Sequence, residues 1–371
     1  MKRKLNSLLV TGGSGFIGSN FIDYTFNEKD FEGKIVNVDK LTYAGNPENL
    51  EGVDKTYGAD GRKRYFFHHG DICNSEEMAL IFRKHDIDTV VHFAAESHVD
   101  RSIFGPKDFI QTNIMGTFTL LEIVRKLRDE GREIHFHHIS TDEVYGSLGD
   151  TGSFYEHTAY DPRSPYSASK ASSDHLVMAY HHTYGLPVTM SNCSNNYGPY
   201  QFPEKLIPLM ILNTMEGKKL PVYGDGMNVR DWLYVTDHCS AIYAILKEGK
   251  NAETYNIGGE NEKPNIDIVH KICEAMEALY PLKKNAAIAQ SESGLKGYKD
   301  LITYVKDRPG HDRRYAINCD KVKNELGWTQ SVTFDIGLEK TVRWYLDNKQ
   351  WVANVRSGEY KKWIDKNYLT R

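Results

Sequence analysis

The chain has 371 residues, a formal net charge of −4, 40% hydrophobic residues and 26% charged residues. This composition is typical of a globular protein and argues against a nucleic-acid-binding surface or a polybasic membrane anchor, because both need an excess of Lys and Arg. No apolar run reaches the length of a transmembrane helix, and the basic N-terminus lacks the long apolar stretch of a secretory signal. We therefore expect a cytoplasmic protein that binds neither nucleic acid nor membranes.

The cysteines also indicate a cytoplasmic protein. There are five, an odd number, and no two are spaced as C-x-x-C. This pattern indicates free thiols in a reducing compartment and argues against a disulfide or zinc framework.

Short apolar runs alternate with longer helical stretches through the first half of the chain. This alternation is typical of βαβ units, which build a parallel sheet with ligands bound beyond the carboxyl ends of its strands. The expected strands are 8–10, 35–38, 65–69, 89–93, 134–139 and 187–190. The polar, Gly-rich segment 46–64 is expected to be a loop or a short irregular excursion.

After residue 195 the pattern becomes mixed and prolines interrupt it. The sequence thus predicts an α/β protein with a Rossmann-type, doubly wound parallel sheet in residues 1–194. A smaller mixed C-terminal lobe that binds the substrate is expected in residues 195–371. Some segments of this second part are expected to return to the sheet.

A glycine-rich turn follows the first expected strand, with Gly12, Gly15 and Gly18. Glycine supplies the backbone angles of the turn and lets a pyrophosphate approach the positive end of the following helix. Asp39 ends the second strand, and its carboxylate suits a free ribose diol and would repel a 2′-phosphate. We therefore expect NAD rather than NADP, although Asp39 could also be a solvated loop carboxylate.

Two further strand ends extend the expected cofactor site. Asp71 and Ile72 follow the third strand and would clamp an adenine, although a simple turn aspartate would look the same at this spacing. Ala94 and Ala95 follow the fourth strand. Their small side chains would let the middle of a dinucleotide lie flat on the sheet.

Tyr166 and Lys170 are four residues apart and share one face of an expected helix. An ammonium and an oxidised nicotinamide both favour the phenolate, which can take a hydroxyl proton while hydride leaves. The spacing alone is uninformative, because similar Tyr-x-x-x-Lys sequences begin at Tyr243, Tyr280 and Tyr345. Tyr166 differs from these because it follows the helix-start signal Ser164-Pro165 one strand-helix step after the fifth strand.

Asp142 and Glu143 place two adjacent carboxylates after the fifth strand. Taken alone, they would be a polar loop. Their place between the cofactor site and the Tyr-Lys pair favours an acid and a base, because carboxylates in different environments can hold different protonation states. Such a pair could expel water from a sugar, which Tyr166 and Lys170 alone could not do.

The histidine-rich run of the fifth strand resembles a metal cluster. His135 and His137 would share one face of the strand and His138 would take the other. No Cys or acid at a metal-ligand spacing accompanies them, so we expect strand packing and no metal.

Together these motifs resemble the dTDP-glucose 4,6-dehydratase family of extended short-chain dehydrogenases/reductases. The resemblance runs from the first strand almost to the C-terminus. It is carried by segments 12–18, 39–45, 94–100, 141–146, 166–170, 195–199 and 308–311. The Thr141-Asp142-Glu143 triplet is what separates these dehydratases from epimerases of the same fold.

The resemblance implies a homodimeric, NAD-dependent lyase that converts dTDP-glucose to dTDP-4-keto-6-deoxyglucose, as in deoxysugar biosynthesis of the dTDP-rhamnose type. It implies that Tyr166 deprotonates the C4 hydroxyl while Thr141 binds that oxygen. It further implies that Glu143 removes the C5 proton and that Asp142 protonates the departing C6 hydroxyl. The alternatives are a nucleotide-sugar epimerase or decarboxylase of the same fold, and a non-catalytic NAD-binding protein.

The candidate site residues fall into three sets. The catalytic set is Thr141, Asp142, Glu143, Tyr166 and Lys170. The cofactor set is Gly12, Gly15, Phe16, Ile17, Gly18, Asp39, Lys40, Thr42, Asp71, Ile72, Ala94, Ala95, Ser97, Thr112, Tyr166, Lys170 and Asn196. The substrate set, which rests on the resemblance, is Ser97, Thr141, Asn195, Lys205, Leu206, Pro221, Tyr223, Arg230, Asn265, Asp307 and His311.

Overall fold

The computed structural model describes residues 2–289 and 294–356. Within this described part, a parallel seven-stranded sheet has the order β10-β6-β5-β4-β1-β2-β3. Its strands are β1 (Ser7–Thr11), β2 (Lys34–Asp39), β3 (Tyr65–His69), β4 (Thr89–His92), β5 (His135–Thr141), β6 (Val188–Cys193) and β10 (Glu253–Ile257). The predicted Rossmann-type sheet is confirmed, and the strand order reverses between β1 and β4, where such sheets bind ligands.

Helices cover both faces of the sheet. One face carries α1 (Phe16–Asn27), α9 (Val235–Glu248) and α12 (Asp320–Leu326). The other face carries α3 (Ser75–Lys84), α6 (Thr117–Asp129) and α7 (Pro165–Tyr184). Each face has its own buried apolar cluster, so the sheet is the middle layer of a three-layer core.

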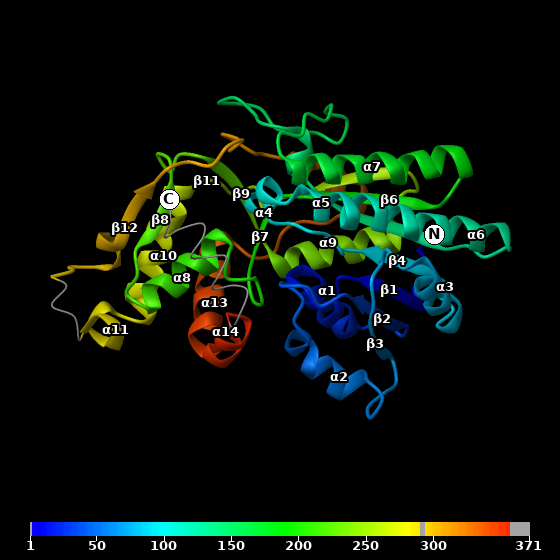
Figure 1. Ribbon diagram of the computed structural model, residues 1–371, viewed down its shortest axis with the longest axis horizontal. Helices are drawn as coiled ribbons and strands as arrows, with labels where there is room; N and C mark the ends of the chain where they lie inside the picture. Colours follow the sequence, from blue (N-terminus) through cyan, green and yellow to red (C-terminus); the bar gives the residue numbers. More distant parts are fainter. Residues whose placement is uncertain (1, 290–293, 357–371) are drawn as a thin grey trace.

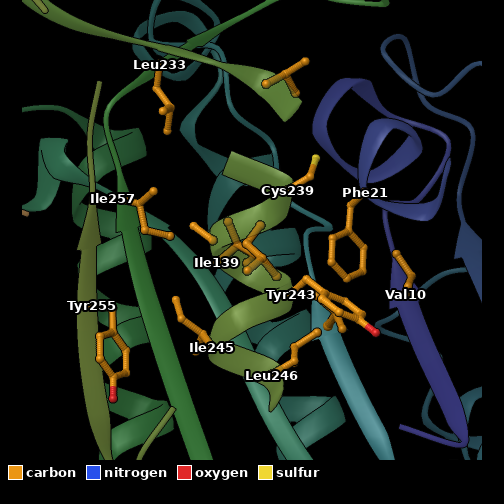
Figure 2. Close-up of a cluster of buried hydrophobic side chains, with 14 of the residues drawn as sticks. Val10, Phe21, Ile139, Leu233, Cys239, Tyr243, Ile245, Leu246, Tyr255 and Ile257 are labelled. Carbon is orange, nitrogen blue, oxygen red and sulfur yellow. The ribbon is translucent and has the colours of Figure 1, made fainter. Parts of the chain in front are cut away.

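The strand β10 and the helix α9 come from the second half of the chain: β10 is an edge strand of the sheet, and α9 covers one of its faces. Figure 2 shows Cys239 and Leu246 of α9 gathered with Phe21 of α1. Strand β10 pairs with β6 along its whole length, from Glu253 opposite Thr189 to Ile257 opposite Cys193.

The rest of the second half forms a smaller lobe beside the sheet (Figure 1). It contains a three-stranded sheet, β11-β9-β7, and a two-stranded sheet, β12-β8. Its strands are β7 (Asn195–Tyr197), β8 (Leu220–Tyr223), β9 (Val229–Tyr234), β11 (Glu262–Pro264) and β12 (Ile302–Val305). Its longer helices are α8 (Leu206–Met215), α10 (Asn265–Leu279), α13 (Phe334–Asp347) and α14 (Lys349–Val355), which share a separate core. The expected second part runs to residue 371, of which residues 357–371 lie outside the described residues.

The loop expected at 46–64 is partly wrong. The segment forms a short 3-10 helix, η1 (Pro47–Leu50), followed by α2 (Glu51–Tyr57). The Asn46 side chain caps η1 by accepting a hydrogen bond from the Glu48 N–H at 3.1 Å. Leu50 and Val53 are buried in the core beneath α1, which is tertiary packing that the polar sequence does not reveal.

The shorter elements connect these layers. They are α4 (Val99–Phe104), α5 (Pro106–Phe109), η2 (Ile110–Gly116), η3 (Asp142–Tyr145), η4 (Leu282–Lys284), α11 (Ala286–Ala289) and η5 (Tyr298–Leu301). Among the helices of the described residues, none has both the length and the apolar character needed to cross a bilayer.

The histidines of β5 pack within the sheet. His135 and His137 both approach the Thr189 hydroxyl of β6, at 2.9 and 2.8 Å. His138 projects to the other face, where its Nε2 lies 3.2 Å from Asp174 of α7. Each ring therefore has a neighbour in the fold that accounts for its position.

Candidate active site

The carboxyl ends of the central strands open onto one cleft of about 300 Å³. It is lined by every residue of the predicted cofactor set and of the predicted catalytic set. From the substrate set, Ser97, Thr141, Asn195 and Lys205 also line it. Residues up to 193 positions apart in the chain, from Gly12 to Lys205, thus meet at one edge of the sheet.

The glycine turn at the end of β1 is packed too closely for side chains at three of its positions, and at Gly13 a Cβ would lie 2.3 Å from Asn37 Oδ1. Gly12 has a φ of +70°, and a Cβ there would lie 2.7 Å from the Ala94 backbone nitrogen. A Cβ at Gly18 would lie 2.4 Å from the Gly12 carbonyl oxygen. Gly15 precedes α1 and faces the cleft, so the amino end of that helix is open to a pyrophosphate. The turn therefore fits a dinucleotide.

Asp39 is a fixed, buried carboxylate rather than a solvated loop residue, since its side chain is only 9% exposed. Its two oxygens accept hydrogen bonds from the Ser14 N–H at 2.9 Å and the Leu41 N–H at 2.8 Å. Burial raises the pKa of Asp39, and these two hydrogen bonds oppose that rise. Nearby, Lys40 and Asp71 form an ion pair at 2.7 Å.

The strand β5 delivers the Thr141-Asp142-Glu143 triplet to the cleft. Thr141 caps η3 by accepting a hydrogen bond from the Glu143 N–H at 3.3 Å. The cap turns the chain sharply after the strand, so both carboxylates enter the cleft. Among the described residues, Asp142 Oδ2 has no hydrogen-bond partner although it is buried.

The two carboxylates differ in their electrostatic surroundings. Burial, and next the Glu143 carboxyl, raises the pKa of Asp142 well above its usual value. Burial also raises the pKa of Glu143, but three cations oppose this rise. In decreasing order of effect they are Arg308, Lys205 and Arg230. Asp142 is therefore suited to hold a proton, and Glu143 is the better candidate for the base.

Tyr166 and Lys170 enter the cleft from the first turns of α7. Ser164 and Ser167 form a capping box at the start of this helix, as the Ser164-Pro165 signal predicts. The Lys170 ammonium donates a hydrogen bond to the Ile139 carbonyl oxygen at 2.7 Å. Both site residues are buried.

The expected lowering of the Tyr166 pKa is not seen in the protein alone. Burial, and next the Glu143 carboxyl, raises the pKa of Tyr166 well above its usual value. Burial also lowers the pKa of Lys170. The positive charge of an oxidised nicotinamide would therefore be needed to make the phenolate.

The remaining substrate-set residues come from the smaller lobe. Arg230 of β9 donates to the Asp312 carbonyl oxygen at 2.8 Å and lies over the Tyr315 ring at 4.1 Å. Tyr223 of β8 is near His311, with ring centroids 6.1 Å apart. His311 in turn contacts Asp307 at 2.6 Å. Seven residues of the substrate set lie outside the walls of the described cleft: Leu206, Pro221, Tyr223, Arg230, Asn265, Asp307 and His311.

A charged pair at the cleft, Arg101 and Glu204, was not predicted from the sequence motifs. Glu204 lines the cleft, and its Oε2 lies 3.0 Å from Nε of Arg101 on α4. The Arg101 guanidinium lies 3.7 Å from the centre of the Tyr43 ring, and Tyr43 is another lining residue. The available signal was weak: Arg101 directly follows the 94–100 motif, and Glu204 directly precedes Lys205.

Comparisons with known proteins agree with this geometry. A family model described as GDP-mannose 4,6 dehydratase matches residues 9–341. Curated relatives named dTDP-glucose 4,6-dehydratase include one from Shigella flexneri, 55% identical over 98% of this chain and 99% of the relative. Another, from Neisseria meningitidis serogroup B, is 55% identical over 96% of this chain and 98% of the relative.

The chain is also similar to solved structures of proteins with the same name. A crystal structure of dTDP-glucose 4,6-dehydratase from Bacillus anthracis in complex with NAD is 46% identical, with a TM-score of 0.80. The match covers 94% of this chain and 99% of that one. The chain belongs to the dTDP-glucose 4,6-dehydratase family.

Proposed function

We propose that the protein dehydrates dTDP-glucose to dTDP-4-keto-6-deoxyglucose with NAD as its cofactor, as a step in deoxysugar biosynthesis. The observation that carries this proposal is the pair of the buried Asp142 and the partly buried Glu143, which shares one cleft with the glycine turn and with Tyr166. The names of the relatives and the NAD complex of the Bacillus anthracis enzyme support it.

The first half-reaction oxidises C4 of the glucose. Tyr166, as phenolate, accepts the proton of the C4 hydroxyl, and Thr141 donates a hydrogen bond to the same oxygen. The Lys170 ammonium favours the phenolate by its charge. When bound, NAD supplies the hydride chemistry, by taking hydride from C4 and later returning it to C6.

The elimination follows from the new C4 carbonyl, which acidifies the C5 hydrogen. Glu143 removes this proton, and Asp142 gives its own proton to the departing C6 hydroxyl. The C6–O bond breaks, water leaves and a C5–C6 double bond forms. After hydride has added to C6, Glu143 returns a proton to C5, so the net change is the loss of one water.

The nucleoside diphosphate would lie between the cleft and the smaller lobe. Lys205, Arg230 and Arg308 supply the positive charge that a diphosphate needs, and Arg can bind it bidentately. The proposed contacts to the remaining nucleotide-sugar groups come from Ser97, Asn195, Leu206, Pro221, Tyr223, Asn265, Asp307 and His311.

We also propose that the protein acts as a cytoplasmic homodimer. The described cysteines are free thiols, which suits a reducing compartment. Three apolar side chains on η2 and α6, Ile110, Met115 and Phe118, are 53%, 43% and 38% exposed. Such a patch on helices that flank the sheet is suited to a second copy of the chain.

The test is a product assay with dTDP-glucose and UDP-glucose side by side, read by mass spectrometry and NMR. We expect a product that has lost one water and carries a C4 ketone, formed faster from dTDP-glucose. Tyr166→Phe is the matched control and should abolish the product while still binding NAD. An epimerised sugar without water loss would contradict the proposal, and NAD binding without any product would favour a non-catalytic role.

A further inference from the structure

The buried carboxylate of Asp174 lies one helical turn beyond Lys170, and the proposed reaction does not use it. Tyr166, Lys170 and Asp174 follow one another at four-residue spacing, so they line one face of α7 with Lys170 in the middle. Asp174 is 1% exposed and Lys170 is 4% exposed. A buried carboxylate is costly unless another group compensates for it.

The contacts of Asp174 hold its carboxylate firmly in place. Its Oδ2 accepts hydrogen bonds from the Ser140 hydroxyl at 2.7 Å and the Tyr160 hydroxyl at 3.1 Å. Its Oδ1 lies 3.2 Å from His138 Nε2 and has no hydrogen-bond partner among the described residues. Burial raises the pKa of Asp174 to about 6, and Lys170 and the two hydroxyl hydrogen bonds oppose this rise, so the carboxylate is ionised above that pH.

His138 stands between the carboxylate and the ammonium. The same Nε2 atom lies 3.5 Å from Lys170 Nζ. Burial, and next the charge of Lys170, lowers the pKa of His138 well below its usual value, so the ring is neutral. A neutral imidazole separates the two charges without adding a charge of its own, and it excludes water from the gap.

Two other groups near Lys170, the Cys193 thiol and the His92 ring, are uncharged. Burial raises the pKa of the Cys193 thiol, at the end of β6, to about 12. His92 of β4, whose ring centroid is 5.3 Å from that of His138, is kept neutral by burial. Burial lowers the pKa of Lys170, and Asp174 is the largest influence that opposes this. The groups that face Asp174 from its surroundings are Ser140, Tyr160, His138, Lys170 and His175.

We propose that Asp174 is a positioning residue, whose carboxylate behind His138 helps to keep the buried Lys170 as an ammonium ion. This inference rests on the proposed function, because the charge of Lys170 matters there only if Tyr166 takes the C4 hydroxyl proton. Asp174 acts through Lys170 and has no contact with the reacting atoms in this scheme.

The proposal has a defined pH consequence. Asp174→Asn removes the negative charge and lowers the pKa of Lys170 further, so the amine loses its proton at lower pH. The rate of C4 oxidation should then begin to fall at a lower pH than in wild type. At the alkaline end of the pH profile this rate should be roughly tenfold lower than in wild type. The acid side of the pH profile should change far less, because Lys170 is protonated there in both proteins.

The experiment measures the first hydride transfer, as bound NADH, across the pH range in wild type, Asp174→Asn and Tyr160→Phe. Tyr160→Phe removes a hydrogen bond to Asp174 but keeps its charge, so it is the matched control and should retain both limbs. An unchanged alkaline limb in folded Asp174→Asn would overturn the proposal, as would an equal shift of that limb in both variants. If Asp174→Asn does not fold, Asp174→Glu keeps the charge and should retain the wild-type alkaline limb, and its loss would count against the proposal.

A second readout separates this inference from the function on which it rests. The titration of Lys170 can be followed without turnover, by NMR of ¹⁵N-lysine-labelled protein assigned with Lys170→Met. Asp174→Asn should lower the pH at which Lys170 titrates, and Tyr160→Phe should not. If wild type forms neither NADH nor product, the proposed function fails, whereas an unshifted titration contradicts the role of Asp174 alone.

Discussion

Asp142 and Glu143 are neighbours in the chain, yet their surroundings give them different affinities for a proton. Glu143 is influenced by three cations, of which Arg308 has the largest effect. Asp142 gains most of its pKa rise from burial and from the Glu143 charge itself. Because a group with a raised pKa stays protonated until the pH exceeds that pKa, Asp142 can serve as an acid at neutral pH. Water loss should therefore decline as the pH rises through the pKa of Asp142.

Asp142→Asn should separate the two half-reactions. The amide cannot donate an acidic proton, so water loss should slow by about 10²- to 10⁴-fold, the usual range for losing a general acid. The first hydride transfer should change far less, so bound NADH should accumulate when substrate is mixed with the enzyme in a stopped-flow spectrometer. Asp225→Asn, at an exposed carboxylate paired with Arg313, is the control and should behave as wild type. Equal loss of both steps would exclude the acid role of Asp142.

The short helix α4 ties the two halves of the molecule together. Its Asp100 accepts hydrogen bonds from Arg308 at 3.0 Å and from the Tyr223 hydroxyl at 3.1 Å. The next residue, Arg101, pairs with the buried Glu204 at 3.0 Å. Arg308 and Glu204 belong to the second half of the chain, and Glu204 directly precedes Lys205. We infer that α4 fixes the cations of the substrate site relative to the sheet.

Breaking the Arg101–Glu204 pair should weaken both stability and substrate binding. Arg101→Met leaves the buried Glu204 without its nearest cation, which should cost about 3–5 kcal/mol in the free energy of unfolding. The Arg101→Met/Glu204→Gln double variant should recover part of this loss, and KM for dTDP-glucose should rise more than kcat falls. Denaturant unfolding and steady-state kinetics measure these effects.

The exposed Arg83–Glu130 pair, treated in the same way, should give much smaller changes. If the loss of stability in the double variant equalled the sum of the losses in Arg101→Met and Glu204→Gln alone, a direct interaction between Arg101 and Glu204 would be contradicted.

At the scale of elements, the sequence predicted the strands and the motifs at their ends. It did not predict contacts between residues that are far apart along the chain. Strands β1 to β6 follow from apolar runs, and the motifs at their ends could be assigned to one edge of the sheet. The pairing of β10 with β6 joins segments more than 60 residues apart, and no local pattern encodes it. The same limit hid the contact of Asp174 with Ser140 and that of Arg101 with Glu204, which are 34 and 103 residues apart along the chain.

At the scale of the whole molecule, the far end of the described chain reaches back to the glycine turn at its beginning. The Trp351 indole N–H of α14 donates a hydrogen bond to Asn49 Oδ1 at 2.7 Å. The Asn49 amide donates in turn to the Ser14 carbonyl oxygen at 3.0 Å. Ser14 lies within the turn, and its N–H is bonded to Asp39. The helix α14 therefore supports the backbone that would hold the dinucleotide.

Trp351→Phe should weaken NAD binding from a distance, because it removes the donor that fixes Asn49 while keeping an aromatic ring in place. Trp328→Phe is a matched control, since this indole also donates a single hydrogen bond, at 2.8 Å, to the Ser240 hydroxyl, which belongs to α9 and not to the turn. Both variants should lose about 1 kcal/mol of unfolding free energy, the usual contribution of one such bond. Only Trp351→Phe should raise the Kd for NAD, by a few-fold in calorimetric titrations. Equal NAD affinity in the two variants would show that α14 stabilises the fold without acting on the cofactor turn.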